Sequence, residues 1–238
     1  MNVMDIVRRL SKQRLSDFKS TKCDENLLIA EILKTRLSER LTAPILDVGS
    51  GLGDIALSAF PDKPSVLLDC EDHAGSKISS CHERVVSDFF RFVSNNSRQF
   101  GTLLFVHVLQ YLDEDVERLF EAVSALRPST IVTVTNDNTG TFGDFISWAS
   151  SNIAEANPER HIDFGLMGRF SLEQQVPFVA TLSYPDFGLM ADDLVTVILD
   201  ASSESRSSVE AAEGWLRHRL RRPQLEIAQT VRYYEAHG

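Results

Sequence analysis

The sequence predicts an α/β protein built on a doubly wound, mostly parallel β-sheet. The first indication is residues 44–55, PILDVGSGLGDI, where an apolar run passes through a glycine-rich loop into a helix-like stretch. The second is that further apolar runs follow, each ending in polar residues and separated by helix-like segments. The third is length, because 238 residues can bury one full-sized core and a small lid.

Composition narrows the functional classes. A net charge of -10 argues against DNA or RNA as the bulk substrate, because binding a polyanion requires neutralisation of its phosphates. The basic runs at 8–14 and 217–222 are then solvated helix faces. No long apolar segment or signal-like stretch occurs, so we expect a cytoplasmic protein without a membrane partner. The cysteines lack metal-ligand spacing, so no metal site is expected.

The glycine loop indicates which ligand the sheet binds. Gly49, Gly51 and Gly53 alternate, which makes a loop against which a flat ligand can lie. A dinucleotide fingerprint needs its third glycine at position 54, where Asp54 would instead repel a phosphate. A GxxxxGK[ST] phosphate loop is also absent from the sequence. The ligand that fits has an adenosine, no phosphate and a cationic group beside Asp47, and S-adenosylmethionine (SAM) has these features.

The stretch Ile45–Gly53, ILDVGSGLG, resembles motif I of the class I SAM-dependent methyltransferases. Asp47, two positions before the first glycine, makes the match more specific than a glycine loop alone. The resemblance covers about residues 43–200 and implies a SAM-binding, seven-stranded Rossmann-like domain there, with SAM as cofactor. It also implies an N-terminal helical lid at 1–42, while 201–238 is an added C-terminal helical extension that covers the sheet or makes a homodimer.

Apolar residues recur on one face within residues 1–42, which predicts helices there.

The next segments of the chain supply candidates for the residues that bind the ribose. The second strand is expected at 66–69, and Asp69 at its carboxyl end is the candidate acceptor of hydrogen bonds from both ribose hydroxyls. Glu71 is the alternative if the strand runs two residues further. Cys70, between them, is placed among the cofactor contacts.

The third strand, expected at 84–90, ends in an acid and an aromatic residue. The resemblance implies that Asp88 reads the adenine amino group and that Phe89 packs on the ring. Alternatively, Asp88 caps the following helix and Phe89 belongs to the core. The residues assigned to the cofactor are Asp47, Gly49, Ser50, Gly51, Gly53, Asp69, Cys70, Asp88, Phe89 and His107.

The fourth strand, expected at 101–108 and followed by a helix at 113–126, resembles the family's fourth motif. That motif faces the methionine part of SAM, so His107 is a candidate general base or cofactor contact, or else a hydrogen-bonded structural histidine. The fifth strand, 130–135, leads into Asn136–Gly140. The amides of this loop suit an amine, a hydroxyl or a carboxylate, and the alternative is an Asx-rich turn that caps the next helix.

The remaining segments complete the expected sheet. Residues 154–175 have no clear periodicity and are expected to form an irregular insertion over the site. The sixth strand is expected at 177–184 and an antiparallel seventh strand at 193–199. Tyr184 would then place its ring near the sulfonium. A C-terminal helical hairpin, broken or kinked at Pro223, would follow.

The expected reaction is O- or N-methyl transfer to a small-molecule metabolite in biosynthesis. Methyl transfer is an in-line displacement at a carbon activated by a sulfonium, so the protein mainly aligns the acceptor and excludes water. Residues 135–138 read TNDN where amide and base methyltransferases carry NPP[YF], which disfavours those acceptors. The candidate catalytic residues are His107, Asn136, Asn138 and Tyr184.

Two alternatives keep the fold. In azetidine-2-carboxylate synthases of similar fold, the amino nitrogen of SAM attacks its own γ-carbon and methylthioadenosine leaves. Asn136, Asn138 and Tyr184 would hold the amino-acid part of SAM bent for that attack. The other alternative is a non-catalytic SAM-binding subunit that contacts a partner through the added helices, against which the intact Asp47 and Gly49 argue.

Overall fold

The computed structural model describes most of the chain in two compact units. The described residues are 23–72, 78–112, 115–153, 161–198 and 206–237. One unit, called here the sheet unit, comprises 27–136, 159–178 and 229–238. The other, called the helical unit, comprises 1–26, 137–158 and 179–228.

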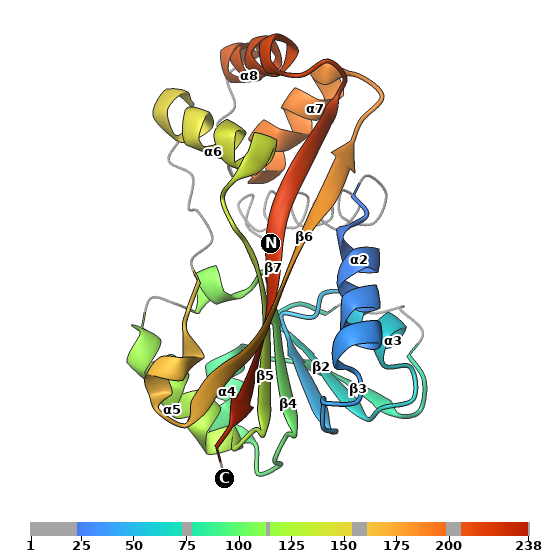
Figure 1. The fold of residues 1–238 in the computed structure, drawn as a ribbon, viewed down its shortest axis with the longest axis vertical. Coiled ribbons are helices and arrows are strands. Elements are labelled where there is room, and N and C mark those ends of the chain that lie inside the picture. Colours follow the sequence, from blue (N-terminus) through green and yellow to red (C-terminus); the bar gives the residue numbers. More distant parts are fainter. Residues whose placement is uncertain (1–22, 73–77, 113–114, 154–160, 199–205, 238) are drawn as a thin grey trace. The chain divides into compact units, whose positions relative to one another are not determined.

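A seven-stranded sheet, in the order β3-β2-β1-β4-β5-β7-β6, confirms the predicted fold class (Figure 1). The strands β1 to β5 pair in parallel, and β7 runs antiparallel to β5. Since β1 is the middle one of the five parallel strands, its carboxyl end lies between those of β2 and β4, where open α/β sheets bind ligands. The strands are β1 (Ile45–Val48), β2 (Ser65–Asp69), β3 (His82–Val86), β4 (Thr102–Val106), β5 (Thr130–Asn136), β6 (Phe170–Ser183) and β7 (Gln224–Ala236).

Helices cover both faces of the sheet unit. In Figure 1, α2 and α3 lie on one side of the sheet, and α4 and α5 lie on the other. Successive strand residues therefore feed two cores, with Leu46 and Val48 in one and Ile45 in the other. The helices are α2 (Glu25–Ile32), η1 (Leu33–Leu37), α3 (Asp54–Ala59), α4 (Phe89–Asn95), η2 (Leu109–Tyr111), α5 (Val116–Leu126), α6 (Gly140–Asn152), η4 (Phe164–Met167), α7 (Phe187–Asp193), η5 (Leu194–Ile198) and α8 (Arg206–Arg219).

Aspartates fix where three helices begin. Asp88 accepts a hydrogen bond from the Arg91 amide at 2.9 Å, and Asp115 accepts one from the Arg118 amide at 3.0 Å. Asp186 caps α7 in the same way. Each carboxylate satisfies one of the amides that a helix leaves unpaired at its start, and its charge suits the positive end of the helix dipole.

In the helical unit, aromatic rings join α6 to α8. Trp148 and Trp215 stack with ring centroids 5.5 Å apart and an interplanar angle of 25°. Phe145 meets the Trp215 ring edge-on at 5.6 Å. This offset and edge-to-face arrangement is the favoured geometry for aromatic pairs, and it anchors the helix that follows the polar segment 201–205.

The seventh strand is not where the sequence predicts it. Residues 193–199 were expected as this strand, but Leu194–Ile198 is helical and β7 lies at 224–236 instead. A short apolar run such as LVTVI fits a buried helix turn as well as a strand, so its periodicity cannot separate the two. The predicted C-terminal helical hairpin is correct for α8 only, because the helix ends at Arg219 and a strand, not a second helix, begins directly after Pro223.

Other differences concern element boundaries. The insertion predicted at 154–175 contains η4 and the start of β6, while 154–160 lies outside the described residues. β6 is the outer strand of the sheet and stays largely exposed, so its sequence carries little apolar periodicity. The third strand ends at Val86 rather than residue 90, and α5 begins at Val116, three residues later than predicted.

The N-terminal segment agrees with its prediction where it is described. Residues 25–37 form α2 and η1, and their buried side chains join one core of the sheet unit. Residues 1–22 lie outside the described residues, so a lid formed by 1–42 stays a prediction. Across the parts of the chain that the structure describes, no helix has the length and apolar character needed to span a bilayer.

Candidate active site

The loop after β1 has the close packing and the open face of a ligand-binding loop. At Gly49, where φ is 69°, an added Cβ would lie 2.6 Å from Cγ2 of Val108. Neither the backbone conformation nor the packing there admits a side chain. At Gly51, where φ is 54°, an added Cβ would meet nothing within 4 Å. The loop is therefore packed against the end of β4 at Gly49 and open at Gly51.

Side chains from β2 and β3 hold this loop. The Gly51 amide donates a hydrogen bond to Oδ2 of Asp69 at 2.8 Å, and Oδ1 of Asp69 accepts one from the Glu71 amide at 3.0 Å. Arg84 donates from Nη1 to the Gly51 carbonyl at 2.7 Å and from Nη2 to the Leu52 carbonyl at 2.9 Å. Asp69, predicted as the ribose acceptor, thus also organises the glycine loop.

Arg84 is the site residue that the sequence prediction missed. It lies within β3, directly opposite Leu67 in β2, and reaches a loop 33 positions earlier in the chain. The available signal was a cationic residue inside a short strand that lies next to β2, the strand that ends in Asp69. That signal has no defined partner until the strand order is known.

Asp47 is a buried carboxyl at the centre of the sheet. Its side chain belongs to the penultimate residue of β1 and is 3% exposed. Burial, reinforced by the negative charge of Asp69, raises the pKa of Asp47 to about 7, and the Arg84 guanidinium opposes the rise. This acid therefore changes its charge near neutral pH, and a nearby cationic ligand group would favour the ionised form.

Ser50 adds an unused polar atom to the loop. Its Oγ is buried and has no hydrogen-bond partner among the residues that the structure describes. A buried hydroxyl without a partner is unfavourable in the absence of a ligand. Together with the open backbone at Gly51, it indicates that this part of the loop is completed by a polar ligand.

The predicted adenine contacts have structural roles. Asp88 caps α4, and the Phe89 side chain is 4% exposed in the core, 5.8 Å from the Phe105 ring in an edge-on contact. The ring of Phe89 is thus covered by protein, as the alternative interpretation from the sequence expected. Asp88 is exposed at the carboxyl end of the sheet, so its contact with adenine stays a prediction.

His107 follows β4 in an unusual backbone conformation. Its φ is 51°, a left-handed value that is uncommon for residues other than glycine. The His107 amide donates to the Val134 carbonyl of β5 at 3.1 Å, and Gln110 donates from Nε2 to the His107 carbonyl at 2.9 Å. Since the next residue, Val108, packs on Gly49, the strained turn at His107 lies beside the glycine loop. Strain of this kind is concentrated at functional sites.

The other three predicted catalytic residues are divided between the units. Asn136 is the last residue of β5, in the sheet unit, and pairs with Gln229 of β7. Because β5 lies next to β4, Asn136 and His107 stand at the ends of neighbouring strands. Asn138 and Tyr184 belong to the helical unit. Burial, followed by the charge and hydrogen bond of Asp193, raises the pKa of the Tyr184 phenol far above its ordinary value, so this hydroxyl keeps its proton. The catalytic roles of all three stay predictions.

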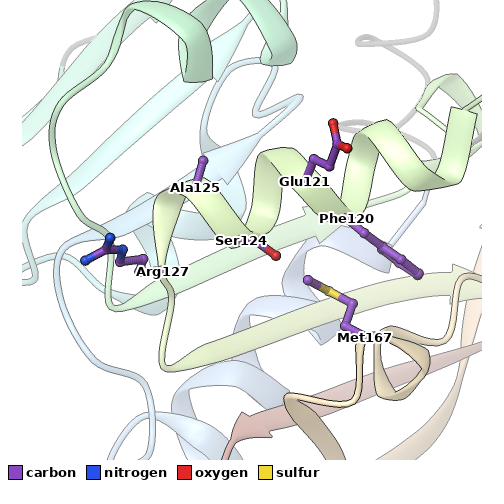
Figure 2. A pocket seen from close by; sticks show the side chains of 6 residues that line it. All are labelled: Phe120, Glu121, Ser124, Ala125, Arg127 and Met167. Atoms are coloured by element: carbon purple, nitrogen blue, oxygen red, sulfur yellow. The ribbon is translucent and has the colours of Figure 1, made fainter.

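A shallow hollow of about 640 Å³ lies elsewhere in the sheet unit. It follows the second half of α5, which leads towards the amino end of β5, whereas the glycine loop follows the carboxyl end of β1. Figure 2 shows the six lining side chains, which are Phe120, Glu121, Ser124, Ala125, Arg127 and Met167. None of them belongs to the glycine loop or to the strand ends beside it, and within the described ranges no cluster of three metal-ligating side chains occurs.

Comparisons with known proteins agree on the fold. The sequence matches no protein-family model and no curated protein. A cyclopropane-fatty-acyl-phospholipid synthase-like protein from Lactobacillus casei matches in structure with a TM-score of 0.56 and 11% identity, over 88% of this chain and 90% of that one. The N-methyltransferase NodS from Bradyrhizobium japonicum, in complex with S-adenosylhomocysteine (SAH), matches with a TM-score of 0.54 and 13% identity, over 98% and 99% of the two chains.

The chain has the class I SAM-dependent methyltransferase fold. A further structure with this fold is the plantazolicin methyltransferase BpumL in complex with a desmethyl analogue and SAH, which matches with a TM-score of 0.51 and 14% identity, over 98% of this chain and 96% of that one. In the present chain, β7 is antiparallel to β5, as predicted for the seventh strand, and it lies between β5 and β6. The structural similarity establishes the fold. The sequence identities are too low to identify the acceptor, which therefore has to be argued from the chemistry of the site.

Proposed function

We propose that the protein is a SAM-dependent methyltransferase that acts on a small-molecule metabolite. The observation that carries this proposal is the glycine loop, which is open at Gly51, carries the unpartnered Ser50 hydroxyl and is flanked by acids rather than by phosphate-binding groups. NodS and BpumL, which share the fold, were crystallised with SAH, the product that SAM leaves after methyl transfer.

The residues present suit the groups of SAM. Gly51 lets the adenosine approach the backbone, and Asp69, at the carboxyl end of β2, is the first candidate acceptor for the ribose hydroxyls. Glu71 is the second candidate for the ribose. Asp47 supplies a negative charge for the ammonium group, and Asp88 is exposed where it would accept from the adenine amine.

The proposed mechanism relies on positioning. SAM supplies a methyl group on a sulfonium, which needs no activation by the protein. Asn136 and Asn138 orient the acceptor through their amides. His107, at Nε2, takes the proton of a hydroxyl or amine acceptor as the methyl group is transferred. The residues that surround the acceptor exclude water, which would otherwise compete with it.

A small acceptor is supported by charge and by sequence. The net charge of -10 disfavours a polyanionic substrate. The TNDN stretch at 135–138 differs from the NPP[YF] tetrad expected for amide or base methylation. NodS is an N-methyltransferase, and BpumL was crystallised with an analogue of its plantazolicin substrate, so the shared fold accommodates such acceptors. We also infer a cytoplasmic enzyme and a homodimer formed through α8.

Mass spectrometry of the purified protein incubated with SAM tests the proposal. Without an acceptor, SAM is expected to stay intact; after addition of a metabolite extract, SAH and one methylated product are expected. Methylthioadenosine with a new four-carbon amino acid would identify a SAM cyclase and refute methyl transfer. SAM binding without turnover across extracts from several sources would instead identify a non-catalytic subunit.

A further inference from the structure

We propose that Arg84 is a positioning residue for SAM, which sets the conformation of the glycine loop through the carbonyls of Gly51 and Leu52. The inference rests on the proposed function, because SAM is the ligand that the loop receives. It adds a residue from within β3, whereas the sequence had assigned a ligand role only to Asp88 and Phe89, which follow this strand.

The hydrogen bonds around Gly51 fix three successive peptide planes. Asp69 accepts from the Gly51 amide at 2.8 Å, which orients the plane between residues 50 and 51. The two nitrogens of Arg84 bind the Gly51 carbonyl at 2.7 Å and the Leu52 carbonyl at 2.9 Å, which orients the next two planes. Each plane is thus held by a charged side chain, and such hydrogen bonds are stronger than neutral ones.

Only an arginine can make this contact from β3. Its guanidinium is a rigid planar fork, so the spacing of its two nitrogens matches two neighbouring carbonyl oxygens. A lysine at position 84 would bring a single ammonium nitrogen, which cannot reproduce the two separate hydrogen bonds that the guanidinium donates to the two carbonyls. Without the fork, a loop containing Gly51 and Gly53 has many accessible backbone conformations, and SAM binding would have to select one of them.

Arg84 also acts on the charge of the site. Asp47 faces the negative charge of Asp69 on β2 and the positive charge of Arg84 on β3. Other titratable groups on elements that pack against β1 are Asp54, which starts α3, and His107, which follows β4. The elements α2 and η1, whose buried side chains share a core with Ile45, carry Glu25, Glu31, Lys34 and Arg36. Loss of the Arg84 charge would leave two acids facing each other and raise the pKa of Asp47 further.

Both effects are measurable with SAH as the probe. Isothermal titration calorimetry of the full chain between pH 5.5 and 8.5 would compare the wild type with Arg84→Gln and Arg84→Lys. Arg98→Gln is the matched control, because Arg98 also makes a two-nitrogen contact with a residue of β3, the exposed Glu83, and not with the loop. Circular dichroism of each variant verifies the fold.

The variants are expected to separate geometry from charge. Arg84→Gln should weaken SAH binding at least about tenfold. The affinity for SAH should rise with pH as Asp47 ionises and then level off, and in Arg84→Gln this levelling pH should be higher than in the wild type. Arg84→Lys keeps the charge but not the fork, so it should weaken binding while the levelling pH stays as in the wild type. Arg98→Gln should change neither quantity.

Three outcomes would overturn the inference. If Arg84→Gln folds and matches Arg98→Gln in affinity and levelling pH, Arg84 does not position the loop. If Arg84→Gln does not fold, Arg84→Lys decides, and wild-type affinity for SAH in that variant refutes the role of the fork. If the wild type itself binds neither SAH nor SAM, the proposed function fails and this inference fails with it, whereas binding by the wild type keeps the two failures distinct.

Discussion

Replacing Asp47 by asparagine is expected to stabilise the ligand-free protein increasingly as pH rises from 5 to 8. Asparagine keeps the shape of the side chain and removes the charge that burial disfavours. The pKa of Asp47 is raised from the ordinary value of 3.8 to about 7 by burial and by Asp69. The folded state therefore favours the protonated form. The free energy of unfolding decreases as pH rises from the ordinary pKa towards the raised pKa, because the unfolded chain ionises this carboxyl more readily than the folded protein does.

The sign and size follow from proton linkage. Because the folded pKa is the higher one, the stability contributed by protonated Asp47 is complete below pH 3.8 and is lost as pH rises through about 7. A shift of about 3 pKa units corresponds to a total of roughly 4 kcal/mol. About 1.7 kcal/mol of this is already lost at pH 5, so the advantage of Asp47→Asn should grow by about 2.5 kcal/mol between pH 5 and pH 8.

Urea unfolding of both proteins at pH 5, 6, 7 and 8, without SAM or SAH, measures this difference. Glu83→Gln is the control, because the hydrogen bond from Arg98 lowers the pKa of Glu83 below its ordinary value of 4.5. The stability that Glu83 contributes is present above that ordinary pKa and is lost only as pH falls below it, so the difference between wild type and Glu83→Gln should stay nearly constant from pH 5 to pH 8. A constant difference between wild type and Asp47→Asn across the pH range would refute the raised pKa and the reasoning from burial.

Two further predictions concern the glycine loop and the proposed base. Gly49→Ala should lower the free energy of unfolding by about 2 kcal/mol or more, because its Cβ would meet Val108 at 2.6 Å in a strained conformation. Gly51→Ala should lower the free energy of unfolding only by the conformational strain, about 1 kcal/mol, and should still abolish SAH binding. Calorimetry that shows equal SAH affinity in Gly49→Ala and Gly51→Ala would contradict an open ligand face at Gly51. With the acceptor in hand, His107→Asn should lower kcat about 100-fold or more at unchanged SAH affinity, and an unchanged kcat would exclude a general base.

Local patterns were sufficient to predict the first strand, the glycine loop and the helix that follows it. The apolar run, the alternating glycines and Asp54 lie within ten residues, and each acts through backbone conformation or charge close to its own position. β1, the loop and α3 therefore appear in the structure as predicted. The five parallel strands also lie at their predicted positions to within a few residues, and β1, β2, β4 and β5 are short, mostly buried apolar runs.

Local patterns failed where two structures suit the same pattern. Leu194–Ile198 is apolar and β-branched and still folds as a helix, while the strand that completes the sheet follows Pro223. The outcome depends on which partner covers the side chains, which is a property of the packed protein.

The sequence by itself determined the fold class, the glycine loop and the acids at the ends of the first two strands, because these depend on interactions between near neighbours. Only the tertiary structure decided that Arg84 holds the loop, since the guanidinium and the Gly51 carbonyl are 33 positions apart and meet only when β3 lies next to β2. It also decided the charge of Asp47, because the pKa of a carboxyl depends on the layers that bury it and on the charges that those layers bring near.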